Sequence, residues 1–168
     1  GLGDVYKRQV SPSAIAALVA ERELAREPGS TVIHNLITSK AVPEIIRENG
    51  GEPVRTRVGH SFIKAKMAET NAVFGGEHSA HYYFRDFWRA DSGMLAAMHV
   101  LAALGQQDKP LSEMMAKYNR YAASGEINSR LDSAEAQADR TEAVVKAFAD
   151  RAENVDRLDG VTVELKDG

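Results

Sequence analysis

Short β-rich runs alternate with longer stretches of helical periodicity between residues 12 and 105, and this alternation is the strongest constraint on the fold. It favours a three-layer α/β domain with a mixed, mostly parallel sheet, because helices usually connect neighbouring parallel strands. Strands are expected over residues 31–36, 53–58, 72–74 and 81–84. Helices are expected from Ser11-Pro12 to Pro28-Gly29, from Thr38 or Ser39 to Asn49, over 61–69 with Phe62, Ile63 and Met67 inward, and from Asp91 or Ser92 to Ala103.

The pattern after residue 105 is weaker and predicts a different kind of segment. The elements expected there are a helix over 110–118, a weakly alternating strand over 121–128, a polar helix over 132–152, and a hairpin arm over 158–165 with Asp159-Gly160 as its turn. The polar helix has one candidate buried stripe, formed by Ala143, Val144, Ala147 and Phe148. This truncated α+β segment has too little apolar surface for its own core, so we expect the chain to stop inside a second domain.

Composition excludes several classes of function. The net charge of -3 gives no electrostatic footprint for nucleic acid or for an anionic membrane. No cysteine is present, which excludes disulfides, thiolate zinc sites and cysteine nucleophiles and is consistent with a reducing cytosol. The longest nearly apolar stretch, residues 94–104, is too short to span a membrane. We therefore expect a cytoplasmic protein with neither a nucleic-acid nor a membrane partner.

The passage Gly75-Gly76-Glu77-His78-Ser79-Ala80-His81-Tyr82-Tyr83-Phe84 carries the most chemistry. In an extended segment Glu77, Ser79 and His81 point to one side, roughly 6–7 Å apart, which is the scale of a sugar ring. A carboxylate accepts from two adjacent hydroxyls, while Ser and His donate or accept, so the spacing indicates a polyol site. The simpler interpretation is a Gly-Gly turn that leads into a half-buried strand, and the spacing alone leaves both open.

A second polar stretch lies where the strand over 53–58 meets the following helix. Ligands of open α/β sheets bind at the carboxyl ends of strands, beside helix N-termini. Arg57, His60 and Lys64 are therefore expected to face an anionic or hydroxylated ligand, in the same cleft as the loop over 77–81. Taken singly, Arg57 and Lys64 are more simply solvated charges, and His60 is a residue at a helix start.

Together the two stretches resemble the third domain of the α-D-phosphohexomutases, and most closely the bacterial phosphomannomutase/phosphoglucomutase branch. The family patterns are Gly-His-Ser-x-Ile-Lys and Gly-Glu-x-Ser-Gly-His, and this chain has Gly59-His60-Ser61-Phe62-Ile63-Lys64 and Gly76-Glu77-His78-Ser79-Ala80-His81. The resemblance covers residues 10–168, and its second motif is the more specific. Ala80 replaces the usual Gly, and Ile37 stands where many members carry a substrate-facing lysine.

The resemblance implies roles for the residues that match these motifs. Glu77 and Ser79 would bind two sugar hydroxyls and set the hexose preference. His81 corresponds to a residue considered for proton transfer. Further substrate-binding residues would be Arg57, Gly59, His60 and Lys64, and no metal ligand is expected in this chain.

The resemblance also implies a domain organisation. Residues 10–121 would be the sugar-recognition domain, and residues 122–168 the N-terminal part of the C-terminal phosphate-binding domain. The family carries its phosphoserine in the first domain and holds Mg²⁺ in an Asp-Gly-Asp-x-Asp-Arg loop of the second, and neither loop occurs in this sequence. Residues 1–9 bear no likeness to that metal loop, so we expect them to be a foreign leader on an internal fragment.

The sequence thus predicts a fragment of a phosphomannomutase/phosphoglucomutase. The full enzyme would interconvert hexose 6-phosphate and hexose 1-phosphate through a phosphoserine, with Mg²⁺ as cofactor and hexose 1,6-bisphosphate as intermediate. The fragment alone is expected to be inactive, and its partners would be hexose phosphates and the missing domains. Two alternatives stay open: a phosphoglucosamine mutase fragment, and a sugar-phosphate-binding α/β module without catalysis.

Overall fold

The computed structural model describes residues 9–166, which divide into two compact units, one ending at Ala122 and the other beginning at Ala123. The foreign leader expected over residues 1–9 lies outside the described residues, except for Gln9. Along the described residues, no helix combines the length and apolarity that a membrane crossing needs.

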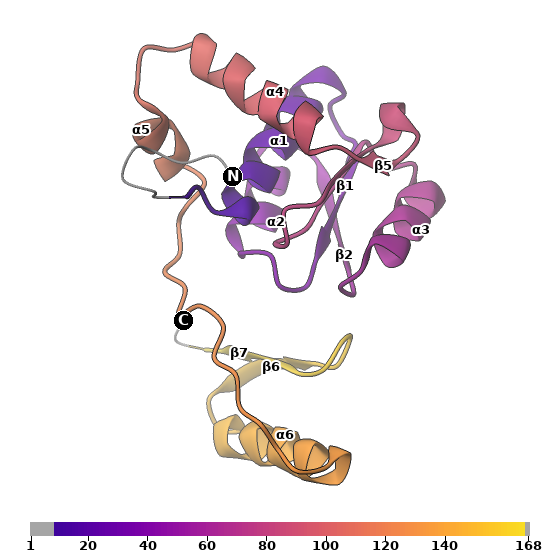
Figure 1. Ribbon diagram of the computed structural model, residues 1–168, viewed down its shortest axis with the longest axis vertical. Helices are drawn as coiled ribbons and strands as arrows, with labels where there is room; N and C mark the ends of the chain where they lie inside the picture. Colours follow the sequence, from indigo (N-terminus) through magenta and orange to yellow (C-terminus); the bar gives the residue numbers. More distant parts are fainter. Residues whose placement is uncertain (1–8, 167–168) are drawn as a thin grey trace. The chain divides into compact units, whose positions relative to one another are not determined.

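A five-stranded mixed sheet forms the centre of the first unit, in the order β2-β1-β3-β4-β5. Figure 1 labels three of these strands, β1, β2 and β5. β1 (Thr31–Asn35) pairs in parallel with β2 (Glu52–Thr56) and with β3 (Phe74–Gly76). β4 (Tyr82–Phe84) and β5 (Ala90–Asp91) extend the sheet in antiparallel fashion. The predicted α/β class and the mixed sheet with a parallel centre are confirmed. Sequence periodicity missed β5, because two residues are too few to show an alternation.

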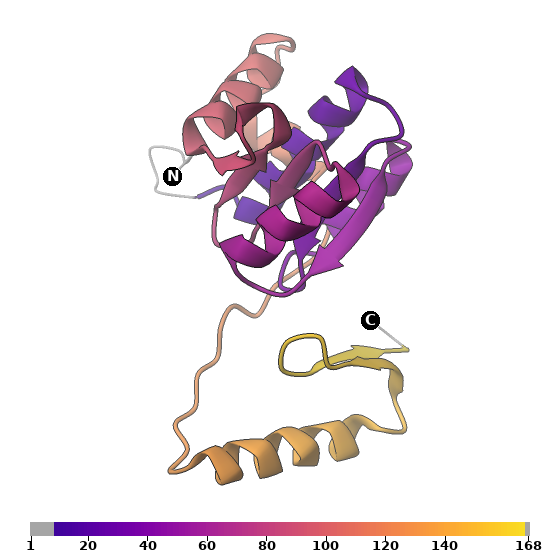
Figure 2. The ribbon, with the colours of Figure 1, turned by 90° about the vertical axis from the view of Figure 1, so that its right-hand side faces the viewer.

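Helices cover both faces of this sheet and make three layers. α3 (His60–Thr70) lies on one face, as Figure 2 shows from its side. Four helices pack in the core on the opposite face: α1 (Pro12–Arg26), α2 (Ala41–Glu48), α4 (Gly93–Gly105) and α5 (Leu111–Ala116). Residues 13–20 of α1 are all buried, and half of them are alanine, so neighbouring helices and the sheet approach α1 closely.

The Gly75-Gly76 pair lies inside β3 and does not form a turn. A Cβ added to Gly75 would lie 2.8 Å from Cγ2 of Ile63 in α3. A Cβ added to Gly76 would lie 2.8 Å from Cβ of Ala16 in α1, on the opposite face. Glycine is therefore needed at both positions because helices press on the two faces of the same short strand.

The prediction is wrong for one of the three residues of α3 that were expected to face the core. Ile63 and Met67 are fully buried, as expected, whereas Phe62 is 44% exposed. Residues four apart share a helix face, but Phe62 lies about 100° from Ile63 around the helix and so faces outward. The Arg57 guanidinium lies 4.9 Å from the centre of the Phe62 ring.

The second unit contains one helix and one hairpin. α6 (Ala134–Phe148) begins after Ser133, whose hydroxyl accepts a hydrogen bond from the Ala136 N–H. β6 (Ala152–Asp156) and β7 (Thr162–Leu165) pair in antiparallel fashion on either side of Asp159-Gly160. The predicted helix over 132–152 is therefore too long, since its C-terminal end is the start of β6.

Two further predictions for the C-terminal part are wrong. Residues 121–128 form no strand and are exposed, because a strand persists only where another strand pairs with it. The expected buried stripe of α6 does not exist within the second unit: no residue of α6 is buried, and Val144 is 51% exposed. A single hairpin offers too little apolar surface to cover a helix.

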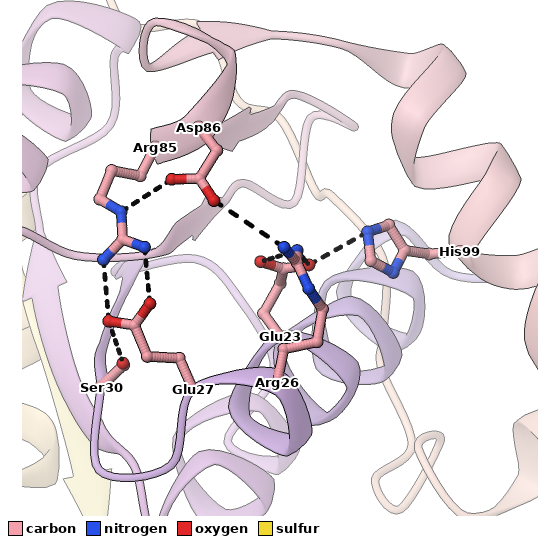
Figure 3. A network of polar contacts seen from close by, with 7 residues as sticks. All are labelled: Glu23, Arg26, Glu27, Ser30, Arg85, Asp86 and His99. Atoms are coloured by element: carbon pink, nitrogen blue, oxygen red, sulfur yellow. Dashed lines mark hydrogen bonds and ion pairs between the residues drawn. The ribbon is translucent and has the colours of Figure 1, made fainter.

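Charged side chains of α1 join α4 and the end of β4 in a polar network (Figure 3). The nearly buried Glu23 contacts His99 Nε2 at 3.2 Å and Arg26 Nη1 at 2.9 Å. Burial alone raises the pKa of Glu23, but hydrogen bonds from His99 and Arg26 outweigh it and lower that pKa overall. One turn later, Glu27 accepts two hydrogen bonds from Arg85, at 2.9 and 2.6 Å. The network links α1 to two elements far away in the sequence.

A buried histidine lies at the end of β1. The Thr38 hydroxyl donates to the Asn35 carbonyl at 2.7 Å, so His34 Nδ1–H must be the donor to Thr38 Oγ1 at 3.0 Å. Burial lowers the pKa of His34 to about 4, and the charges of Arg55 and Arg47 act in the same direction. His34 is therefore neutral when the chain is folded at neutral pH.

We expect the free energy of unfolding to fall between about pH 7 and about pH 5, because the unfolded chain then binds a proton at His34 that the folded chain does not. The contribution of this residue is at most about 2 kcal/mol over that interval. His34→Gln should flatten this part of the pH dependence in urea unfolding. Equal slopes for the wild type and His34→Gln would contradict the expectation.

Candidate functional site

A buried carboxylate connects segments that meet at the carboxyl ends of the parallel strands. Glu77 follows β3 and is only 2% exposed. Its Oε1 accepts hydrogen bonds from Asn35 Nδ2 and from the Gly59 N–H, each at 3.2 Å, and its Oε2 accepts one from the Tyr83 hydroxyl at 2.8 Å. A carboxylate offers about four acceptor positions, so one position remains, on Oε2.

The donors to this carboxylate come from three separate parts of the fold. Asn35 ends β1, Gly59 precedes α3, and Tyr83 lies on β4. Gly59 has φ +128°, which an L-residue rarely adopts, and this conformation directs its N–H to Glu77. Burial raises the pKa of Tyr83, and the hydrogen bond to Glu77 raises it further, so the phenol stays protonated as a donor.

The loop over residues 77–81 is a tight turn and not the extended segment that we predicted. The Glu77 N–H donates to the His81 carbonyl at 3.0 Å, and the Ala80 N–H donates to the Glu77 carbonyl at 3.2 Å. Ala80 closes the turn with φ +67°, a conformation that costs an alanine about 1–2 kcal/mol. The hydrogen bonds across the turn replace those that an extended strand would need from a neighbour.

His78 holds this turn against the helices behind it. Its Nδ1 lies 2.8 Å from Oγ of the buried Ser13 in α1, and Ser13 Oγ also accepts from the Ser39 N–H at 3.1 Å. His78 therefore does not line the pocket described next. Glu77, Ser79 and His81 do line it, so these three side chains share one side even though the backbone turns.

The turn borders a pocket of about 430 Å³ at the carboxyl ends of the parallel strands. Its lining residues are Val58, Gly59, His60, Lys64, Glu77, Ser79, His81, Tyr83 and Asp91. His60 and Lys64 lie four residues apart on α3, so they share one face of that helix. Polar groups from α3, the turn and β5 thus converge on one cavity.

The structure brings together all but one of the residues singled out in the sequence. Gly59, His60, Lys64, Glu77, Ser79 and His81 line the pocket. Arg57 is not among the lining residues and lies instead over the ring of Phe62. Arg57 therefore lies at the same end of the parallel strands as the other residues, but it does not line the pocket.

Three pocket or anchor residues had no signal in the sequence. Asn35 and Tyr83 read as ordinary strand residues, yet both donate to Glu77. Asp91 was expected only as a helix cap, but the cap of α4 is Ser92, which accepts from the Leu95 N–H. A sequence motif contains only residues that are close together along the chain, whereas strand pairing brings these three residues to the pocket.

Asp91 and His81 form a hydrogen-bonded pair at the pocket rim. His81 Nδ1 lies 2.7 Å from Asp91 Oδ2, and Asp91 Oδ1 accepts the Tyr82 N–H at 2.8 Å. Pairing of β4 with β5 places Asp91 opposite Tyr83 and so beside His81. The pair is partly exposed, with 52% of the His81 side chain accessible.

The described part of the chain contains no group of three or more His, Asp or Glu side chains that could hold a metal ion. In the pocket, the carboxylates of Glu77 and Asp91 each accept protein hydrogen bonds through both oxygens. The polar groups of the pocket are suited to hydrogen bonding with a polar ligand.

The fold and the pocket define an α/β domain with a cavity lined by polar groups at the carboxyl ends of its parallel strands. Residues 11–121 match the family model for the phosphoglucomutase/phosphomannomutase α/β/α domain III. The chain belongs to the phosphoglucomutase/phosphomannomutase family. The family predicted from the two motifs is thereby confirmed.

Similar proteins span much more sequence than this chain does. It is 36% identical over 152 residues to phosphohexose mutases of Xanthomonas campestris, and 38% identical over 154 residues to a phosphomannomutase of Escherichia coli. These matches cover 90% and 91% of this chain, but 33% of each relative. A solved phosphoglucomutase/phosphomannomutase family protein from Burkholderia thailandensis superposes with a TM-score of 0.78 and 32% identity, covering 96% of this chain and 34% of that one. The chain thus spans about a third of the length of its relatives.

Glu77→Gln is expected to lower the free energy of unfolding by about 2–4 kcal/mol. The amide keeps one acceptor oxygen and replaces the other with a donor, so Asn35, Gly59 and Tyr83 all lose a charged acceptor. One of the three contacts must also break or reverse its direction. Tyr83→Phe removes a single hydrogen bond and should cost about 1–2 kcal/mol. Urea unfolding of the two variants measures the difference, and a Glu77→Gln chain as stable as the wild type would contradict this account.

Proposed function

We propose that this chain is the sugar-recognition part of a hexose phosphate mutase that interconverts hexose 6-phosphate and hexose 1-phosphate. The observation that carries the proposal is the convergence of Gly59, His60, Lys64, Glu77, Ser79 and His81 on one pocket, at positions that match both family motifs. The names of the relatives support the same activity.

Each side chain has chemistry that suits a sugar phosphate. Glu77 has one free acceptor position for a hydroxyl, and Ser79 both donates and accepts. A second hydroxyl on Glu77 would replace one of its present donors. The Lys64 ammonium, on the same face of α3 as His60, supplies positive charge for a phosphate. Hydroxyl recognition and charge neutralisation are the contributions that phosphoryl transfer needs from such a domain.

The remaining chemistry would come from outside this chain. In the proposal, residues 10–121 recognise the sugar and residues 122–168 begin a phosphate-binding domain. The phosphoserine and the Mg²⁺ ligands would belong to the part of the enzyme that this chain does not span. Hexose 1,6-bisphosphate would be the intermediate that reorients between the two half-reactions.

Binding is the direct test on the chain as it stands. Titration with mannose 1-phosphate, followed by amide NMR, should shift the Gly59, Ser79 and Ala80 signals, with weak affinity because one domain supplies only part of the contacts. Ser79→Ala should weaken binding, whereas Ser124→Ala, an exposed serine beyond Ala122, should leave it unchanged. Equal shifts with inorganic phosphate alone, or no shifts around the pocket, would contradict sugar recognition here.

Activity is the second test, and it uses two proteins. The 168-residue chain should show no turnover of mannose 1-phosphate above a catalyst-free blank, since it would lack the nucleophile and the metal. A chimera of the Escherichia coli phosphomannomutase, in which residues 11–121 of this chain replace the matching domain, should regain mutase activity in a coupled assay. Turnover by the chain alone, or a folded chimera that binds sugar phosphate but is inactive, would contradict the proposed division of roles.

A further inference from the structure

We propose that Asp91 is a positioning residue for His81: it holds the imidazole as the Nδ1–H tautomer and leaves Nε2 as the proton acceptor at the pocket. The part of this inference that concerns catalysis rests on the proposed function. The geometric part concerns only this chain and can be tested on it alone.

The carboxylate of Asp91 is itself held in place. Its Oδ1 accepts the Tyr82 N–H at 2.8 Å, which leaves Oδ2 directed to His81 Nδ1 at 2.7 Å. The backbone beside it is fixed as well, because the Ser92 N–H donates to the Tyr82 carbonyl at 2.9 Å. Asp91 thus forms hydrogen bonds with both His81 and Tyr82, so the imidazole cannot rotate freely.

The charge state of Asp91 decides where the imidazole proton lies. An ionised carboxylate only accepts hydrogen bonds, so His81 Nδ1 must carry the hydrogen in the 2.7 Å contact. The other ring nitrogen, Nε2, then has a free lone pair. When Nε2 takes a proton from a hydroxyl, the adjacent carboxylate stabilises the imidazolium that forms.

The surroundings of His81 differ from those of the other titratable groups that line the pocket. Tyr83 stays protonated, since burial and its bond to Glu77 raise its pKa, and its ring centre lies 6.5 Å from that of His81. Glu77 is occupied by three donors on the inner wall. Lys64 and His60 face the cavity from α3, and a lysine ammonium donates only. His81 is the pocket base that has a carboxylate partner among the described residues.

A surface ion pair of no consequence is the simpler explanation, since exposed pairs contribute at most about 1 kcal/mol. That explanation does not account for the second hydrogen bond of Asp91, which it accepts from the Tyr82 N–H. It also does not explain why the Asp91 and His81 side chains both line the pocket. The two explanations differ in what Asp91→Asn should do. An amide keeps the acceptor for the Tyr82 N–H but can present Nδ2–H₂ to His81, which reverses the donor and the acceptor.

The first experiment measures the His81 tautomer by ¹⁵N NMR on the 168-residue chain near neutral pH. The neutral wild-type ring should be mainly Nδ1–H, and Asp91→Asn should shift it mainly to Nε2–H. Asp86→Asn, which removes an exposed carboxylate from the same connection between β4 and β5, should leave the tautomer unchanged. A wild-type ring that is mainly Nε2–H, or an unchanged tautomer in Asp91→Asn, would overturn the positioning role.

The second experiment measures kinetics in the active chimera. Asp91→Asn should lower kcat about 10²–10⁴-fold, the usual contribution of a positioned acid or base, and change KM only a few-fold. Asp91→Glu should recover part of kcat, and Asp86→Asn should resemble the wild type. If Asp91→Asn raised KM and left kcat unchanged, the catalytic role would be overturned, even if the His81 tautomer reversed. A wild-type chimera without mutase activity would count against the proposed function, while the NMR result would still decide the positioning role.

Discussion

The arrangement of the pocket depends on the buried Glu77 carboxylate. It joins the end of β1, the start of α3 and the middle of β4 through hydrogen bonds from Asn35, Gly59 and Tyr83. A buried charge is costly unless its acceptor positions are filled, so these donors and the carboxylate require one another. The same interaction therefore stabilises the fold and sets the inner wall of the pocket.

Two side chains fix the turn that carries Glu77 from opposite sides. His78 reaches back to Ser13 in α1, and His81 reaches forward to Asp91 in β5. Between them, Ser79 is left free to line the cavity, and Ala80 takes the left-handed conformation that closes the turn. A turn held at both ends presents its polar groups without the entropy loss that a mobile loop would incur on binding.

Local sequence pattern was a good guide to the first unit and a poor one to the second. Apart from the two-residue β5, the strands and helices up to Gly105 were predicted because their apolar faces are covered in the folded unit, as Ile63 and Met67 show. Predictions failed where the pattern promised burial that no neighbour provides: Phe62 is outside the packed face of α3, and the stripe of α6 has only a hairpin beside it. Periodicity reports which face is apolar, but a packing partner decides which face is buried.

The sequence by itself determined the α/β class, the family, and the residue types that meet at the pocket, because the motifs around Gly59 and Glu77 are contiguous and chemically distinctive. Only the tertiary structure decided that Gly75-Gly76 lies in a strand with a helix packed against each face. It also decided that Glu77 is buried with three donors and that Asp91 pairs with His81. These facts arise from strand register and from helices packed across a sheet. Such contacts join residues that are far apart in sequence or on different elements, so no local pattern encodes them.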